Sequence, residues 1–90
     1  MSTDLDTRRK RAAYRAAHRG TKEMDLLLGR YATAKLDGMS EAELTHFEHL
    51  LGEPDPDLQH WIMDAQAIPE DRFAALIDSL KAFHLLPARA

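Results

Sequence analysis

Four residues within one short segment, HRGTKEMD at residues 18–25, are suited to recognising a charged partner: Arg19, Gly20, Glu23 and Asp25. Arg19 and Glu23 lie four residues apart, so their side chains can share one small surface patch. An arginine offers a planar fork for carboxylates, and a glutamate can accept hydrogen bonds from basic or amide groups. Gly20 permits a left-handed turn and leaves no side chain between its backbone and an approaching molecule. The segment therefore indicates a contact surface built on a helix-ending turn.

A row of arginines leads into this segment. Arg8, Arg11, Arg15 and Arg19 are spaced by three, four and four residues, so they share one face of a helix. Residues 8–22 contain seven basic side chains and no acidic one. A solvated helix face is the ordinary interpretation of such a run. However, like charges four residues apart destabilise an isolated helix, so the row favours a partner with carboxylate or phosphate groups.

The charge of the chain is divided unevenly. Residues 1–30 carry eight basic and four acidic side chains, whereas residues 31–90 carry four basic and eleven acidic ones. The main alternative function is a small helical nucleic-acid-binding or regulatory module that lays its first helix on phosphates. The acidic remainder of the chain argues against it, because a nucleic-acid-binding domain is usually basic throughout.

Signs of an enzyme or a metal centre are weak. His46 and His49 lie three residues apart, and His60 follows further along the chain, without the spacing of a known zinc motif. We interpret them as histidines of polar helix faces, and we expect no metal site and no catalytic residue. The glycines are scattered, so no phosphate-binding loop is predicted. A small enzyme that uses the His46 region remains the second alternative.

Hydrophobic periodicity predicts an all-α fold, a compact bundle of five helices in a single domain. The first helix covers residues 8–18 and ends at Gly20, and the second covers 22–36, with Thr21 as its N-cap and Gly29 at a close helix contact. The third begins with a capping box of Ser40 and Glu43 and ends at Gly52. In the fourth we expect Asp55 as N-cap and Pro56 as first helical residue, and the fifth opens near Pro69. We expect residues 1–7 and 85–90 to be flexible.

Three further features of the sequence indicate where in the cell the protein is found. The sequence has no cysteine, no apolar stretch long enough to span a membrane, and no apolar segment of the kind found in secretory signals. We therefore expect a cytoplasmic protein that does not insert into membranes.

The order of motifs along the chain resembles the SdhE family of FAD assembly factors. The resemblance covers residues 8–84 and is carried by HRGTKEMDLLLGRYA, MSEAEL and LLGEPDPDLQHWIM. Its most specific element is the RGxxE motif, which corresponds here to Arg19, Gly20 and Glu23, and it is supported by Asp25 and Trp61.

The resemblance implies a five-helix protein that is not an enzyme. Separately from the resemblance, we expect the protein to be a monomer when free. Members bind the flavoprotein subunit of succinate dehydrogenase, and in some bacteria that of fumarate reductase. They promote covalent attachment of FAD to a histidine of that subunit, so FAD is the partner's cofactor and no stably bound cofactor is expected here. The RGxxE surface is implied to contact the flavoprotein near its flavin.

Overall fold

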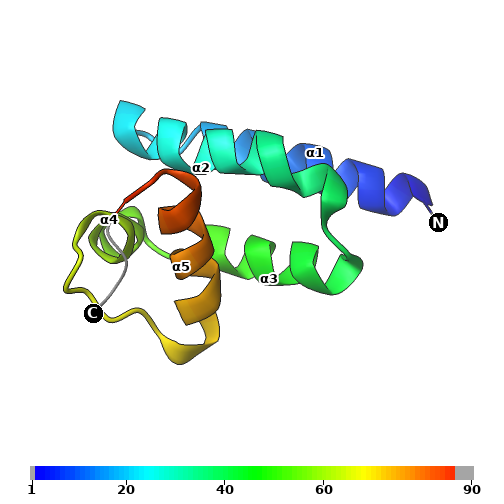
Figure 1. The fold of residues 1–90 in the computed structure, drawn as a ribbon. Coiled ribbons are helices and arrows are strands. Elements are labelled where there is room, and N and C mark those ends of the chain that lie inside the picture. Colours follow the sequence, from blue (N-terminus) through cyan, green and yellow to red (C-terminus); the bar gives the residue numbers. More distant parts are fainter. Residues whose placement is uncertain (1, 87–90) are drawn as a thin grey trace. The chain divides into compact units, whose positions relative to one another are not determined.

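The chain folds into five α-helices (Figure 1). The computed structural model describes residues 2–86, with side chains from residue 4 onward, and contains no strand within that range. The prediction of an all-α fold is confirmed. The helices are α1 (Ser2–Ala17), α2 (Lys22–Lys35), α3 (Glu41–Leu51), α4 (Asp55–Met63) and α5 (Ala74–Phe83). Two 3-10 helices, η1 (Leu36–Gly38) and η2 (Asp71–Phe73), precede α3 and α5.

Packing divides the helices into two units. One ends at Gly52 and contains α1, α2 and α3, and the other begins at Glu53 and contains α4 and α5. None of the helices among the described residues is both long enough and apolar enough to cross a bilayer.

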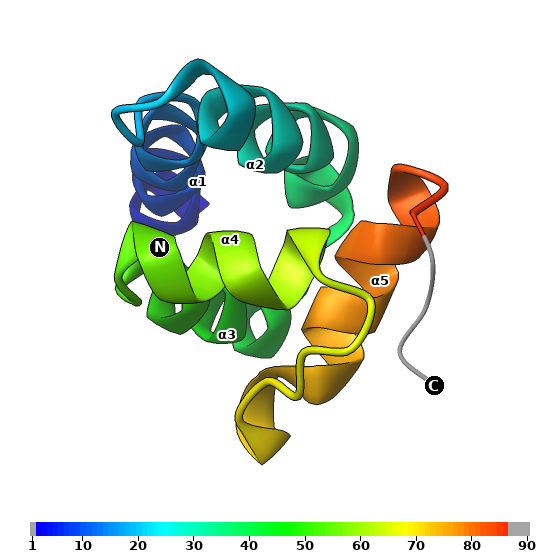
Figure 2. The same cartoon turned by 90° about the vertical axis from the view of Figure 1, so that its left-hand side faces the viewer.

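In the first unit, α1 and α2 form a closely packed antiparallel pair, with α3 along the same pair (Figures 1 and 2). The buried face of α1 consists of small side chains, Ala12 and Ala16. A Cβ atom placed on Gly29 of α2 would lie 3.3 Å from the Cα and Cβ atoms of Ala17. This approach is tighter than a side chain at position 29 would normally allow, so the predicted close contact at Gly29 is confirmed.

The apolar core of this unit comes from α2 and α3. Met24, Leu28 and Tyr31 of α2 are buried, and the ring of Tyr31 lies 6.0 Å from the ring of Phe47, centroid to centroid. The capping box at the start of α3 is confirmed, because Ser40 and Glu43 bond each other's backbone N–H groups. The capping box and Gly52 thus bound α3 as the sequence predicts.

Helix α1 begins at Ser2, although the sequence predicted a flexible segment over residues 1–7 and a helix start at residue 8. Asp4 lies in the first turn, where a negative charge complements the helix dipole. Asp6 forms an ion pair with Arg9, three residues further along the helix, at 3.5 Å. These local charge interactions stabilise the helix in the turns that precede residue 8.

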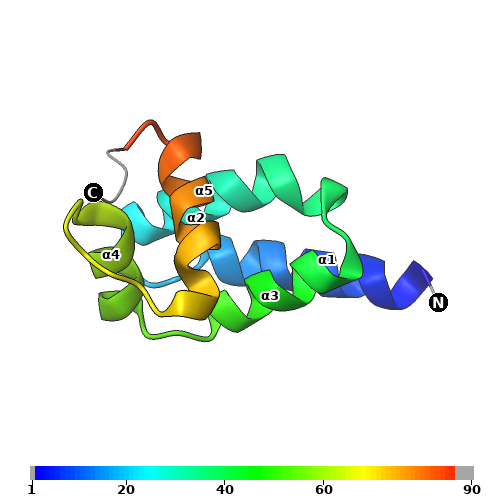
Figure 3. The ribbon, with the colours of Figure 1, turned by 60° about the horizontal axis from the view of Figure 1, so that its bottom comes forward.

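The second unit is built on α4 and α5, which are linked by a long loop and by η2 (Figure 3). Leu58, Trp61 and Ile62 of α4 are buried, and the ring of Trp61 lies 6.1 Å from that of Phe73. Two predicted boundaries are wrong. Pro54 is the N-cap of α4, because its carbonyl accepts the first helical bond, from the N–H of Leu58 at 3.1 Å, and Asp55 is already helical.

The second wrong boundary is the start of the fifth helix. Residues near Pro69 are not helical, and the single 3-10 turn of η2 precedes the first residue of α5, Ala74. Lys81 of α5 is buried, and its Nζ atom donates to the carbonyl of Asp64, the C-cap of α4, at 3.3 Å. The lysine thereby satisfies a carbonyl at a helix end, where such groups lack helical partners.

Helix α5 ends in a Schellman motif in which a leucine occupies the left-handed position. Leu85 has φ +58°, and the N–H groups of Leu85 and Leu86 bond the carbonyls of Ala82 and Lys81. Leu85 is 92% exposed, so it gains little from packing in return for its backbone conformation. Of the segment 85–90 that the sequence predicted to be flexible, residues 87–90 lie outside the described residues.

Leu85→Gly should therefore stabilise the protein by about 1 kcal/mol, because glycine adopts the left-handed conformation without the Cβ clash. The measurement is the free energy of unfolding in urea. The control is Ala82→Gly at an exposed position of the same helix, which should destabilise by a similar amount. A loss of stability in Leu85→Gly would contradict the assignment of strain to this position.

Candidate partner-binding site

The turn between α1 and α2 is held in a conformation that requires glycine. Gly20 has φ +114°, a backbone conformation that L-residues with a side chain rarely adopt, and it is exposed. A Cβ atom at this position would meet no atom within 4 Å. The protein's own packing therefore leaves the space above Gly20 open, and the backbone there is accessible to another molecule.

Hydrogen bonds on both sides of Gly20 fix the turn. A carboxylate oxygen of Asp25 accepts from the backbone N–H of Arg19 at 2.5 Å. The hydroxyl of Thr21 accepts from the N–H of Met24 at 3.2 Å, which confirms Thr21 as the N-cap of α2. Asp25, which the sequence predicted as a contact residue, thus has a role in holding the turn.

The side chain of Arg19 is directed into the fold. Its Nη1 atom donates to the carbonyl of Leu51 at the end of α3, at 2.6 Å. The last carbonyls of a helix lack helical partners and attract cations, so an arginine is well suited to this position. The sequence predicted that Arg19 would pair with a carboxylate of a partner, whereas in the structure this guanidinium joins the turn to α3.

Glu23 is the exposed acidic member of the motif. It lies in the first turn of α2, where its charge complements the helix dipole. Gly20 and Glu23 therefore present a backbone surface and a carboxylate on a turn that Arg19 and Asp25 hold in shape. We call these four residues the RGxxE turn.

Arg8, at the other end of the arginine row, is bound to α3. Its guanidinium donates to both carboxylate oxygens of Glu48, at 2.7 and 3.2 Å, and to the hydroxyl of Thr45 at 2.8 Å. A carboxylate oxygen of Glu41 lies 3.3 Å from the Nη1 atom of the same guanidinium. The sequence predicted Arg8 as a partner-binding residue, but its donors are used within the chain. The acidic residues that neutralise Arg8 lie on α3 rather than on its own helix, so the spacing of charges along α1 does not reveal them.

The hydrogen bond from Arg8 holds the pKa of the Glu48 carboxyl below its ordinary value of 4.5, against the opposing effect of partial burial. Glu48 is therefore ionised in the folded protein at pH values where the unfolded chain has already bound a proton. The stabilisation from this pair is complete above the unfolded pKa and is lost as the pH falls through the folded pKa.

Glu48→Gln should make the free energy of unfolding less dependent on pH below about pH 4.5. The measurement is urea unfolding followed by circular dichroism between neutral pH and pH 3 or below. Glu41→Gln is the matched control, because Glu41 contacts the same guanidinium with a side chain that is 71% exposed, and it should change the profile less. Equal profiles for the two variants would contradict the role of Glu48.

Arg11 and Arg15, in the middle of the row, are exposed. The part of the chain that the structure describes offers neither of them a hydrogen bond or an ion pair. The structure thus divides the predicted arginine row into two anchored ends, Arg8 and Arg19, and an exposed middle.

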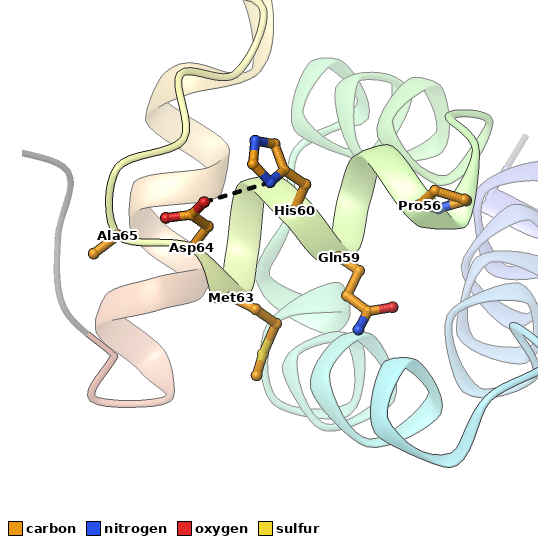
Figure 4. Close-up of a pocket in the computed structure, with 6 residues that line it drawn as sticks. All are labelled: Pro56, Gln59, His60, Met63, Asp64 and Ala65. Atoms are coloured by element: carbon orange, nitrogen blue, oxygen red, sulfur yellow. Dashed lines mark ion pairs between the residues drawn. The ribbon is translucent and has the colours of Figure 1, made fainter.

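The histidines that the structure describes do not form part of a metal-binding cluster. Over residues 2–86, no three histidine, cysteine, aspartate or glutamate side chains are placed to hold a metal ion. His60 forms an ion pair with Asp64 at 3.6 Å when it is protonated. The pair lies on one side of a shallow groove of about 610 Å³ along α4, and Gln59 and Met63 point to the other side (Figure 4).

Comparison with known proteins places the chain in a family. Residues 10–84 match the family described as "Flavinator of succinate dehydrogenase". The chain is 39% identical over 74 residues to "FAD assembly factor SdhE" of Acetobacter pasteurianus, an alignment that covers 82% of this chain and 68% of that protein.

Mitochondrial proteins are also similar. "Succinate dehydrogenase assembly factor 2, mitochondrial" of Dictyostelium discoideum is 36% identical over 69 residues, with 77% of this chain and 49% of that protein covered. The protein of the same name from Danio rerio is 38% identical, with 88% and 51% covered. The chain therefore spans about half the length of these mitochondrial relatives. The match over residues 10–84 shows that the chain belongs to the family of succinate dehydrogenase flavinators.

Proposed function

We propose that this chain binds the flavoprotein subunit of succinate dehydrogenase through the RGxxE turn and promotes covalent attachment of FAD to that subunit. The family match and the names of the relatives from Acetobacter pasteurianus and Dictyostelium discoideum support this role. We extend the proposal to the flavoprotein of fumarate reductase as a second client. We further propose that the protein acts in the cytoplasm and is a monomer when free.

The observation that carries the proposal is the exposed backbone at Gly20 on a turn that the rest of the unit fixes. Asp25 bonds the N–H of Arg19, and the guanidinium of Arg19 bonds the end of α3. A surface that is already in its bound conformation loses little conformational entropy when a partner docks. The two hydrogen bonds of Arg19 fix the turn, and the backbone at Gly20 is unobstructed, so the turn is suited to docking a partner.

The proposed contribution to flavinylation is positioning. The flavoprotein supplies the flavin and the histidine that becomes linked to it, so a helper needs only to favour a geometry in which the two can react. Glu23 can accept hydrogen bonds from basic or amide groups of the flavoprotein, and Gly20 allows the two backbones to approach closely. In this proposal the chain is not an enzyme, and FAD remains the cofactor of its partner.

Glu23→Ala should weaken capture of the flavoprotein by about tenfold, the loss expected for one charge-assisted hydrogen bond. Its melting temperature should fall no further than that of Asp57→Ala, which removes an exposed acid from the first turn of α4. Both variants lose a favourable interaction with a helix dipole, so their difference isolates the contact. Equal capture by the two variants would limit the role of Glu23 to its interaction with the helix dipole.

The function itself is tested by purifying a tagged copy from cells that contain succinate dehydrogenase. We expect the flavoprotein subunit to co-purify, and we expect in-gel fluorescence of covalent flavin on that subunit to be lost when the gene for this chain is deleted. Undiminished fluorescence in the deletion strain would contradict the proposal.

A further inference from the structure

The exposed face of α1 carries a groove that is separate from the residues of the RGxxE turn. The groove encloses about 380 Å³ and lies along a single helix. Its lining residues are spaced by three, one, three and one positions, as expected for one helical face: Thr7, Lys10, Arg11, Tyr14 and Arg15. We call it the α1 groove.

An aromatic pair forms the apolar part of this face. Tyr14 is 66% exposed, and its ring stacks on that of His18 with centroids 4.0 Å apart and an interplanar angle of 16°. A ring nitrogen of His18 lies 2.8 Å from the carbonyl oxygen of Tyr14, within hydrogen-bond distance. The tyrosine ring is therefore held against its neighbour, although neither ring is in the core. A fixed, exposed aromatic ring is suited to contact with an apolar side chain.

The cations of the groove are not neutralised within the described residues. Lys10, Arg11 and Arg15 are exposed, and none of them has an ion pair or a hydrogen bond there. Arg15 lowers the pKa of Glu48 through its charge but makes no ion pair with it.

The neighbouring arginines of the same helix contrast with these three. Arg8 binds Glu48 and Thr45, and Arg9 binds the carbonyl of Met39 and pairs with Asp6. The chain thus neutralises Arg8 and Arg9 and leaves the cations beside Tyr14 exposed.

We propose that the α1 groove docks an acidic segment of another protein. An apolar side chain of that segment lies on the ring of Tyr14 and on the aliphatic stems of Lys10 and Arg11, and its carboxylates pair with Arg11 and Arg15. Charge complementarity favours this occupant, since three exposed cations surround the ring. A short acidic segment fits better than a nucleic acid, because residues 31–90 carry eleven acidic and four basic side chains and would repel a long polyanion. The inference goes beyond the proposed function, because it concerns a second surface.

The test measures binding of three fluorescein-labelled peptides by fluorescence anisotropy. The first is rich in glutamate and carries leucines, the second has serine in place of each leucine, and the third has lysine in place of each glutamate. We expect the first peptide to bind most tightly, the second about tenfold more weakly, and the third not measurably. Affinity for the first peptide should fall as salt is raised through the range where the screening length drops to about 8 Å.

Variants locate the binding to the groove. The double variant Arg11→Glu/Arg15→Glu should bind the first peptide at least ~10-fold more weakly, since each change reverses a charge. Tyr14→Ala should weaken the leucine peptide and leave the serine peptide unchanged. Arg30→Glu makes the same kind of charge change at an exposed position of α2 outside the groove, and it should bind about as tightly as the unmodified protein. Far-UV circular dichroism confirms that each variant is folded.

Three results would overturn the inference. They are no binding of the leucine-containing acidic peptide, equal loss of binding in Arg30→Glu and in the double variant, and tighter binding of a single-stranded oligonucleotide of equal charge than of that peptide. None of these results depends on flavinylation, so failure here and failure of the proposed function are distinguishable.

Discussion

Gly20→Arg should abolish covalent flavinylation of the succinate dehydrogenase flavoprotein, whereas Gly20→Ala should retain a measurable part of it. Both variants place a Cβ atom at φ +114°, so both carry a comparable backbone strain of roughly 1–3 kcal/mol. Only arginine adds a long side chain over the open space above the turn, where the partner's backbone is proposed to lie. The measurement is fluorescence of covalent flavin on the flavoprotein in cells that express each variant.

Alanine at position 20 is the control that separates the docking surface from the fold. If strain alone mattered, the two variants would lose stability and flavinylation in parallel. Unfolding in urea should give similar free energies for the two, because no atom of the chain lies within 4 Å of the added Cβ. Full flavinylation with folded Gly20→Arg would show that this turn is not the contact.

Trp61→Ala should destabilise the protein by about 3–5 kcal/mol, the usual loss when a buried tryptophan is truncated. Trp61 is 8% exposed, and its ring packs against Phe73 in the unit formed by α4 and α5. Unfolding should be followed by far-UV circular dichroism, because the chain has a single tryptophan and the variant removes its fluorescence.

The matched control for Trp61 is Met63→Ala on the same helix, where the side chain is 45% exposed. Met63→Ala should cost less than about 1 kcal/mol, as for most surface substitutions. A loss below 1 kcal/mol in Trp61→Ala would show that this ring does not hold the second unit together. A flavinylation defect in Trp61→Ala should disappear at temperatures where the variant is folded.

Local sequence signals predicted the helix starts that depend on a single side chain. Thr21 and Ser40 bond the first N–H groups of their helices as expected, because an N-cap acts within three residues of itself. Gly29 was predicted to mark a close contact, although its neighbour, Ala17, could be found only in the structure. The start of α4 was misplaced by one residue, since the sequence alone does not show which carbonyl accepts the first helical bond.

The parts that sequence analysis missed depend on contacts between helices. Arg8 meets Glu48 forty positions away, and Arg19 meets the backbone of Leu51, whose carbonyl has no sequence signature. Lys81 is buried although lysine is ordinarily exposed, because the end of α4 offers it a carbonyl. The sequence grouped the residues of the RGxxE turn along the chain, and their role as a contact surface stays a prediction. The division of their roles between holding the turn and facing outward required the structure.

The central claim is tested most directly by flavinylation with purified components. The flavoprotein subunit of succinate dehydrogenase, prepared without covalent flavin, is incubated with FAD in the presence and absence of this chain. Flavin that resists denaturation of the protein is then followed with time. We predict that the chain raises the rate of covalent attachment by at least ~10-fold through positioning and that Gly20→Arg does not. An equal rate with and without the chain would contradict the account.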